Sequence, residues 1–208
     1  LYRAAGNDAR HQIKLGLATS KDGINFVRKS DKPAFEGHHD DPDGGCAEDP
    51  RLMKIDGVYY LTYAARPYAP GRYWLPYEQR SEEAKAWKRP HADSEPWFLR
   101  TNETLTYLAI TKDFVTYKRL GRITDAREDD RDVVIFPRKI NGKFYMISRP
   151  VIDGDRSMWI SSSDDLMEWR TRQKLYSGVE EWESGRVGAG CPPIETEDGW
   201  VLIYHGVS

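Results

Sequence analysis

Hydrophobic and polar residues alternate along most of the chain, and one strand-and-turn pattern occurs three times. It is a strand that ends in a polar turn followed by an aromatic residue: "LATSKDGINF", "LAITKDFVTY" and "WISSSDDLMEW". In each copy an aspartate stands four positions before the aromatic, and a Ser or Thr stands two positions before the aspartate. A hydroxyl and a carboxylate at this spacing can accept hydrogen bonds from the backbone of their own turn. We therefore predict three turns of one kind, at Asp22, Asp113 and Asp165.

A second pattern alternates with the first. It consists of a proline, a short strand, a two-residue turn and an aromatic strand, as in "DPRLMKIDGVYYLTY", "FPRKINGKFYMIS" and "PPIETEDGWVLIY". Asp-Gly and Asn-Gly between apolar stretches are typical of type I′ hairpin turns, because both turn residues need positive φ. The predicted turns are Asp56-Gly57, Asn141-Gly142 and Asp198-Gly199.

Together the two patterns form a repeat of about four strands with a spacing of roughly 50 to 60 residues, which is the period of propeller blades. The sequence therefore predicts an all-β protein, a β-propeller with about three blades and part of another, in one domain over residues 1–208. Residues 66–103 interrupt the repeat with aromatic and charged residues but no strand alternation. A loop of this length is usually functional or disordered, and its Trp and Tyr residues favour an ordered loop that faces a substrate.

Composition narrows the function classes. The chain has 208 residues, of which 12% are aromatic, and a net charge of −2. This charge provides no basic surface for nucleic acid, and no apolar run approaches the roughly 20 residues that cross a bilayer. Two cysteines, Cys46 and Cys191, do not make a disulfide framework, and two reduced thiols are favoured over a bridge between them. The chain opens without Met and ends on strand-like sequence, so we expect a piece of a longer protein, truncated at both ends.

The candidate site residues lie in the segments that begin each hairpin. Propellers bind ligands at the central channel, where the innermost strands converge, and these proline-led segments are expected to face it. The segment "AEDPR" contains Glu48, Asp49 and Arg51. The other candidates are Arg3 in "LYRAAG", Arg131, Asp132, Arg138, Lys139 and Arg149 around the second hairpin, and Tyr204 and His205 at the third.

These residue types favour one reaction. Cleavage of a glycosidic bond normally needs two carboxyl groups, one as acid and one as base or nucleophile. Here one acid, Asp49, accompanies several cations. Inorganic phosphate is already a nucleophile, so it needs no base, but its charge must be held, which arginines do well. Taken singly, Asp49 fits an ordinary turn and His205 a structural histidine; their recurrence at equivalent hairpin positions favours phosphorolysis.

At these residues the sequence resembles glycoside hydrolase family 130, the mannoside phosphorylases. The matching stretches are "LYRA", "EDPR", "RDVVIFPRKINGKFYMISRP", "SSSDDLMEW" and "GAGCPPIETEDGWVLIYHGV". The resemblance implies a five-bladed β-propeller in which Asp49 is the general acid, its proton passing through a hydroxyl of the bound mannose. It also implies that Arg131, Arg149 and His205 bind phosphate, with Lys139 as a weaker match, and that Arg3 lies near the donor sugar.

The resulting expectation is an inverting β-mannoside phosphorylase that forms α-mannose 1-phosphate and a shortened acceptor sugar. Phosphate is the co-substrate, with no metal or organic cofactor, and Glu48, Arg51, Asp132 and Tyr204 join Arg3 in binding substrate. Two alternatives stay open: an inverting β-mannosidase with a glutamate base in "VEEWESG", or a propeller that binds glycans without cleaving them. A sugar phosphate is useful inside a cell, so we expect a cytoplasmic protein; a homo-oligomer stays open.

Overall fold

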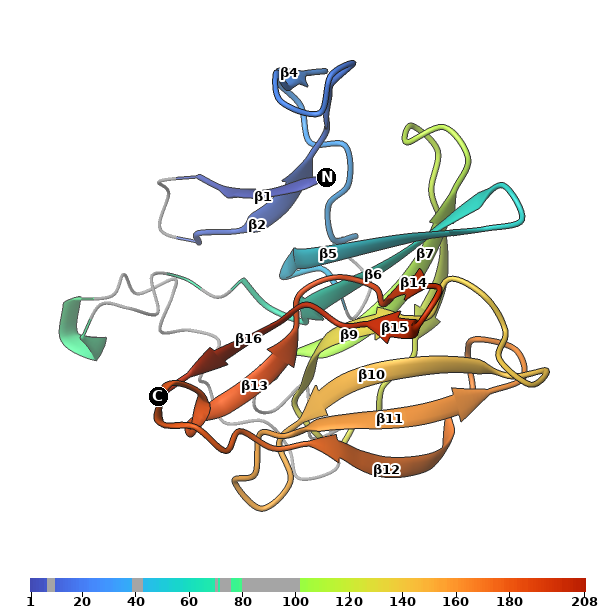
Figure 1. Ribbon diagram of the computed structural model, residues 1–208. Coiled ribbons are helices and arrows are strands. Elements are labelled where there is room, and N and C mark those ends of the chain that lie inside the picture. Colours follow the sequence, from blue (N-terminus) through green and yellow to red (C-terminus); the bar gives the residue numbers. More distant parts are fainter. Residues whose placement is uncertain (7–9, 39–42, 70, 72–75, 80–101) are drawn as a thin grey trace.

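The computed structural model describes residues 1–6, 10–38, 43–69, 71, 76–79 and 102–208. This part of the chain is all-β, with sixteen strands, two short 3₁₀ helices and no α-helix. None of its helices is long and apolar enough to cross a membrane. Two four-stranded sheets come from the middle of the chain, and smaller two-stranded sheets precede and follow them in sequence (Figure 1).

Each four-stranded sheet is an antiparallel meander, in which strands that follow one another in sequence pair with one another. This is the pattern expected of a propeller blade. The first sheet contains β5 (Cys46–Ile55), β6 (Val58–Arg66), β7 (Leu105–Thr111) and β8 (Lys118–Arg122). The second contains β9 (Asp130–Ile135), β10 (Phe144–Pro150), β11 (Met158–Ser163) and β12 (Arg170–Tyr176).

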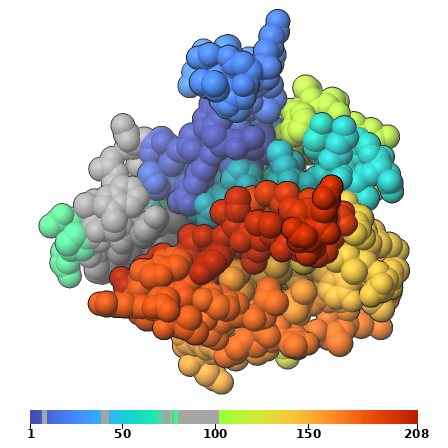
Figure 2. Space-filling model, in the orientation of Figure 1, coloured from blue at the N-terminus to red at the C-terminus, as the bar shows by residue number. Residues whose placement is uncertain are grey.

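The smaller sheets resemble parts of further repeats. Towards the N-terminus β1 (Tyr2–Ala5) pairs with β2 (Ile13–Gly16), and β3 (Ala18–Thr19) pairs with β4 (Val27–Arg28). Towards the C-terminus β13 (Arg186–Ala189) pairs with β16 (Tyr204–Val207), and β14 (Ile194–Thr196) pairs with β15 (Gly199–Val201). The 3₁₀ helices are η1 (Tyr77–Gln79) and η2 (Glu181–Glu183). Figure 2 shows these units as contiguous lobes coloured in chain order.

The core lies between successive sheets. Strand β9 is buried on both faces: Val133 and Ile135 pack with Leu108 of the first sheet, while Val134 packs with Val187 of β13. Alternate residues of a strand point to opposite faces, so an apolar run such as "VVI" is suited to a strand between two neighbours. A third cluster joins the first sheet to the N-terminal strands and includes Leu15, Phe35, Leu61 and Tyr63.

The three predicted aspartate turns are confirmed. Asp22 Oδ1 accepts hydrogen bonds from the N–H groups of Ile24 (2.9 Å) and Asn25 (2.8 Å), and Ser20 Oγ accepts one from the Gly23 N–H (2.9 Å). The same bonds recur around Asp113 with Thr111 and around Asp165 with Ser163. The repeat predicted from sequence is therefore a repeat of local hydrogen bonding.

Two of the three predicted hairpin turns are confirmed and the third is wrong by one residue. Asp56-Gly57 and Asn141-Gly142 have positive φ at both positions, as type I′ turns require. In the third hairpin Thr196 pairs with Gly199, so the two turn residues are Glu197 and Asp198. Thr196 Oγ1 donates a hydrogen bond to the Gly199 carbonyl oxygen (3.0 Å), which favours this register.

The prediction of an all-β fold is confirmed, whereas a five-bladed ring is not. Within the described ranges the strands form separate sheets, and none of these sheets closes on itself. Cys46 is buried and Cys191 half-buried, and both are free thiols.

Candidate active site

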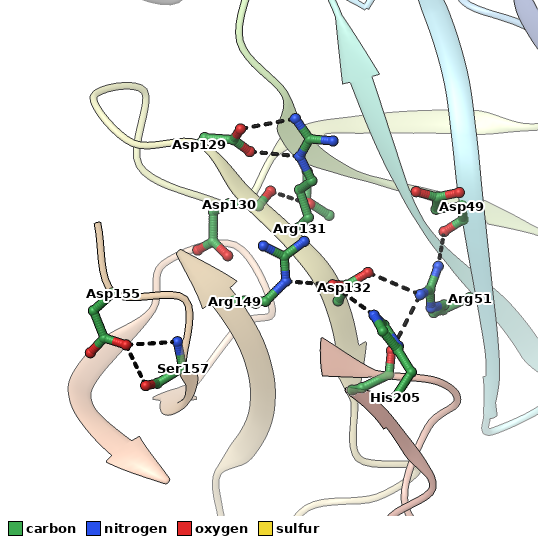
Figure 3. Close-up of polar contacts among 12 residues, drawn as sticks. Asp49, Arg51, Asp129, Asp130, Arg131, Asp132, Arg149, Asp155, Ser157 and His205 are labelled. Carbon is green, nitrogen blue, oxygen red and sulfur yellow. Dashed lines mark hydrogen bonds and ion pairs between the residues drawn. The ribbon is translucent and has the colours of Figure 1, made fainter. Parts of the chain in front are cut away.

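One polar cavity of about 370 Å³ lies where the two four-stranded sheets meet the two-stranded sheet of β13 and β16 (Figure 3). Three carboxylates, four arginines and a histidine line it. They come from β5, from β9 and the loop before it, from β10 and the connection after it, and from β13 and β16. The lining residues are Asp49, Asp129, Arg131, Asp132, Arg149, Val151, Arg156, Arg186 and His205.

Asp49 reaches the cavity from an irregularity in β5. The pairing register of β5 with β6 shifts between Glu48 and Arg51, and Asp49 has a left-handed backbone with φ of 51°. Bulges of this kind redirect a side chain and are common next to active sites. Arg3 Nη1 donates a hydrogen bond to Asp49 Oδ1 (2.8 Å), and Arg3 Nη2 lies 3.1 Å from Glu48 Oε2. Glu48 is buried and Asp49 is half-buried, and the guanidinium of Arg3 compensates the negative charge of both carboxylates.

Asp132 occupies a similar irregularity in the next sheet and lies close to two arginines and a histidine. Its φ is 55°, beside a register shift between β9 and β10. Arg51 Nη2 donates to Oδ1 (3.2 Å), Arg149 Nε donates to Oδ2 (2.6 Å), and His205 Nε2 lies 3.7 Å from Oδ2. Arg51 also donates to the carbonyl oxygens of Asp49 (2.7 Å) and Ala189 (3.2 Å), so it connects three parts of the site.

Arg131 is held by a carboxylate that the sequence analysis did not select. Its Nε and Nη2 donate to Asp129 Oδ1 (2.8 Å) and Oδ2 (2.9 Å), a bidentate geometry that is strong and directional. Although burial opposes the charge, this carboxylate raises the pKa of Arg131. Burial likewise opposes ionisation of Asp129, but the hydrogen bond from Arg131 lowers its pKa. The two residues form a fixed ion pair in the wall of the cavity.

Two further arginines were also missed. Arg156, in the turn between β10 and β11, is exposed, and Arg186, at the start of β13, is half-buried. Neither guanidinium forms an ion pair within the described part of the chain. Arg186 could have been found, because it begins the third hairpin segment much as Arg131 begins the second. Arg156 follows the Asp153-Gly154 turn, which has the Asp-Gly signal of a type I′ turn but belongs to neither repeated pattern, so only the fold shows that it reaches the cavity.

Lys139 and Tyr204 lie outside the cavity lining. Lys139 lies between the end of β9 and the Asn141-Gly142 turn, where its ammonium group is 4.7 Å from the centre of the Phe144 ring. The Tyr204 hydroxyl donates to Glu183 Oε2 (2.9 Å), which leaves it engaged with a buried carboxylate. Arg138, beside Lys139, forms a surface ion pair with Glu195.

Glu183 of "VEEWESG" has a structural environment. It is 1% exposed and also accepts hydrogen bonds from the Tyr176 hydroxyl (2.7 Å) and the Val179 N–H (3.1 Å). Burial opposes the effect, but these hydrogen bonds lower the pKa of Glu183. Among the described residues no group of three or more His, Cys, Asp or Glu side chains is placed to hold a metal ion.

Comparison with known proteins identifies relatives of this arrangement. The family described as beta-1,4-mannooligosaccharide phosphorylase matches residues 1–208. A 1,2-beta-oligomannan phosphorylase of Thermoanaerobacter sp. (strain X514) is 36% identical over 193 residues, which are 92% of this chain and 52% of that protein. A beta-1,2-mannobiose phosphorylase of Listeria innocua is 44% identical over 105 residues, 49% of this chain and 29% of that protein.

A solved structure of beta-1,2-mannobiose phosphorylase from Listeria innocua, in complex with beta-1,2-mannobiose, is similar in fold. It superposes with a TM-score of 0.72 at 30% identity, over 95% of this chain and 46% of that one. The chain thus spans about half the length of the relatives that it matches. The match over the whole chain shows that it belongs to glycoside hydrolase family 130.

Proposed function

We propose that this protein is an inverting β-mannoside phosphorylase. The observation that carries the proposal is the composition of the cavity: Asp49 faces a cluster of arginines, two of which have no carboxylate partner in the described chain. Phosphate supplies the attacking oxygen, the glycosidic bond breaks, and the departing oxygen takes a proton that originates from Asp49. Inversion converts a β-mannoside into α-mannose 1-phosphate.

Most of the basic side chains in and beside the cavity have a role in this proposal. Arg131 keeps Nη1 available, since Asp129 occupies its Nε and Nη2. Asp132 contacts both Arg149 and His205, and Arg186 lines the same cavity with no ion pair to any residue that the structure describes. Preorganised donors of this kind stabilise charge on phosphate and on the departing oxygen without reorganising during the reaction. We assign these four residues to phosphate, and Arg3, Glu48 and Arg51 to positioning Asp49 and the donor sugar.

Hydrolysis is the first alternative, and the charge pairing argues against it. An inverting hydrolase needs a second carboxylate that activates water. Asp132 and Asp129 are each bound to arginine, and Glu183 is buried against two tyrosine hydroxyls. A glycan-binding protein without activity would have no need for unpaired arginines around an acid.

We further propose a β-1,2-linked substrate and an acceptor site near residues 66–103, within a complete five-bladed propeller. The relatives at 36% and 44% identity are named for β-1,2-linked mannosides. Most of the inserted segment lies outside the described residues, but its ends reach the site: Arg66 Nη1 donates to the Asn102 carbonyl oxygen (2.7 Å), and Arg66 Nε is 3.7 Å from Glu48 Oε1. Phosphorolysis keeps the energy of the cleaved bond in a sugar phosphate, which is useful inside a cell. We therefore propose that the reaction takes place in the cytoplasm.

The test is sugar release from β-1,2-mannobiose with and without inorganic phosphate, with β-1,4-mannobiose as the comparison substrate. We expect mannose 1-phosphate, formed only when phosphate is present and faster from the β-1,2-linked disaccharide. Free mannose released at a rate indifferent to phosphate would establish the hydrolase instead. Faster cleavage of the β-1,4-linked disaccharide would overturn the linkage alone.

A further inference from the structure

A buried carboxylate that the proposed reaction does not use lies behind one wall of the cavity. Glu183 is 1% exposed and ends the 3₁₀ helix η2, two residues before β13. Its Oε1 accepts hydrogen bonds from the Tyr176 hydroxyl (2.7 Å) and from the N–H groups of Val179 (3.1 Å) and Glu180 (3.3 Å). Its Oε2 accepts a hydrogen bond from the Tyr204 hydroxyl (2.9 Å). Both oxygens of the buried group are therefore held by directed donors.

These hydrogen bonds join three segments of the chain. Tyr176 ends β12, the last strand of the second four-stranded sheet, whereas Tyr204 begins β16. Glu183 itself belongs to η2, which packs against β16 and leads directly into β13. Glu183 thus connects the two-stranded sheet of β13 and β16 to the second four-stranded sheet.

Strand β16 lies directly against η2. A Cβ on Gly206 of β16 would lie 2.5 Å from Glu183 Cβ and 2.6 Å from Cζ3 of Trp182, distances that real side chains do not adopt. The Trp182 ring also lies beside the Tyr204 ring, with 5.8 Å between their centres. The position of β16 is therefore closely coupled to the position of Glu183.

His205 lies on the opposite face of the same strand. Successive residues of a strand point to opposite faces, so Tyr204 and Gly206 face η2 while His205 faces the cavity. There His205 Nε2 is 3.7 Å from Asp132 Oδ2 (Figure 3). A displacement of β16 relative to η2 would move this imidazole within the cavity.

We propose that Glu183 is a positioning residue for the phosphate side of the cavity: by holding the Tyr204 hydroxyl it fixes β16, and with it the imidazole of His205. The inference rests on the proposed function only for the identity of the anion. A merely structural carboxylate would affect the free energy of unfolding, whichever of its two tyrosine partners is lost. A positioning carboxylate affects phosphate binding through Tyr204 alone.

The experiment compares Tyr204→Phe with Tyr176→Phe as its matched control. Each variant removes one hydroxyl that donates to Glu183 and keeps the aromatic ring, but β12, which carries Tyr176, contributes no residue to the cavity lining. We expect Tyr204→Phe to raise KM for phosphate about fivefold, because a small displacement of a binding group is costly. Since this is a loss of uniform binding, kcat should change little. Tyr176→Phe should keep the KM of the unmodified protein.

The imidazole NMR signals of His205 provide a second measurement that needs neither phosphate nor turnover. They are identified by their loss in His205→Gln, and they should shift in Tyr204→Phe but not in Tyr176→Phe. If a melting curve shows that Tyr204→Phe folds poorly, Glu183→Asp takes its place. This variant keeps the charge but shortens the side chain by one methylene, so it should weaken phosphate binding and shift the His205 signals in the same way.

Calorimetric titration of inorganic phosphate into the same proteins separates this inference from the proposed reaction. If no mannose 1-phosphate forms, the reaction is wrong, yet the phosphate affinities and the His205 signals still test Glu183. The positioning role would be overturned by unchanged His205 signals in Tyr204→Phe, by unchanged phosphate affinity in that variant, or by equal losses of affinity in Tyr204→Phe and Tyr176→Phe.

Discussion

At the scale of single residues, the site depends on two aspartates in the left-handed backbone region. Asp49 (φ 51°) and Asp132 (φ 55°) lie on the first strands of successive sheets, each beside a shift in strand register. This conformation costs on the order of 1 kcal/mol for a residue with a Cβ, so it persists only where neighbouring contacts hold it. The same backbone feature thus presents an acid in one sheet and, in the next, an acceptor that gathers arginines.

We expect Asp49→Asn to lower phosphorolysis by about 10²-fold to 10⁴-fold, because the amide cannot supply a proton to the departing oxygen. The measurement is the initial rate of mannose 1-phosphate formation, and phosphate binding should change little. Asp56→Asn is the matched control, since Asp56 lies in the turn of the same hairpin and Asn is also favoured in type I′ turns. An unchanged rate in Asp49→Asn would show that Asp49 is not the general acid.

At the scale of elements, the cavity depends on how closely β13 approaches the first strand of the preceding sheet. A Cβ on Gly188 of β13 would lie 2.3 Å from Asp132 Oδ2 and 2.8 Å from His205 Cε1. Contacts this short cannot exist, so any side chain here must displace the carboxylate that binds Arg51 and Arg149. Glycine is required at position 188 because β13 lies too close to Asp132 of β9 to leave room for a Cβ.

We expect Gly188→Ala to raise KM for phosphate at least about tenfold while the protein still folds, because the displaced Asp132 no longer orients Arg149. Steady-state kinetics and a melting curve check this together. Gly190→Ala serves as control: its Cβ would meet the Ile203 carbonyl oxygen at 3.2 Å, away from the cavity lining. Wild-type kinetics in Gly188→Ala would show that Asp132 does not orient the phosphate ligands.

At the scale of the whole molecule, stability comes from apolar clusters between sheets and from polar bonds that cross between them. Thr62 Oγ1 of β6 donates to the Val133 carbonyl oxygen of β9 (2.7 Å), and Thr106 Oγ1 of β7 donates to that of Asp130 (2.9 Å). Asp130 is 4% exposed, and its Oδ1 has no hydrogen-bond partner within the described chain. Burial away from water disfavours the ionised form of such a carboxyl group.

Burial raises the pKa of Asp130 from 3.8 to about 7, which makes stability depend on pH. Between about pH 4 and pH 7 the folded state holds a proton that the unfolded chain has released, so the free energy of unfolding falls as pH rises. We expect Asp130→Asn to lack this fall, which is on the order of 2 to 4 kcal/mol. Denaturant unfolding at about pH 5 and pH 8 measures it.

The exposed Asp164, which is paired with Lys143, gives the control for this prediction: Asp164→Asn should keep the wild-type slope. Equal pH slopes in the protein and in Asp130→Asn would mean that Asp130 ionises freely in the folded state.

Local features of the fold were predictable from sequence, because their causes lie within a few residues. The Ser-x-Asp turns depend on hydrogen bonds to N–H groups two or three residues away, and the Asp-Gly and Asn-Gly turns depend on the φ preferences of two adjacent residues. The hairpin at Glu197-Asp198 departed from prediction because a Thr196 side-chain bond and strand pairing select the register. Closure of the sheets into a ring depends on residues far apart in the sequence, so local sequence patterns could not predict it.

From the sequence, candidate site residues could be selected only because they belong to the hairpin segments. Their ion-pair and hydrogen-bond partners could be identified only from the three-dimensional structure. Sequence reasoning selected Asp49, Arg131, Arg149 and His205, which the structure places in one cavity. It selected Lys139 as well, although a strand carries that residue to the far end of the sheet.

The sequence by itself determined the strand order, the repeated turns, the residue types of the site and, through its motifs, the family. Only the tertiary structure decided which charges pair: Asp129 with Arg131, Asp132 with Arg51 and Arg149, and Arg3 with Glu48 and Asp49. Pairing depends on distances of about 3 Å between residues on different sheets, and no periodicity along a single strand encodes those distances. Among the described residues this pairing leaves Arg156 and Arg186 of the cavity lining without an ion pair.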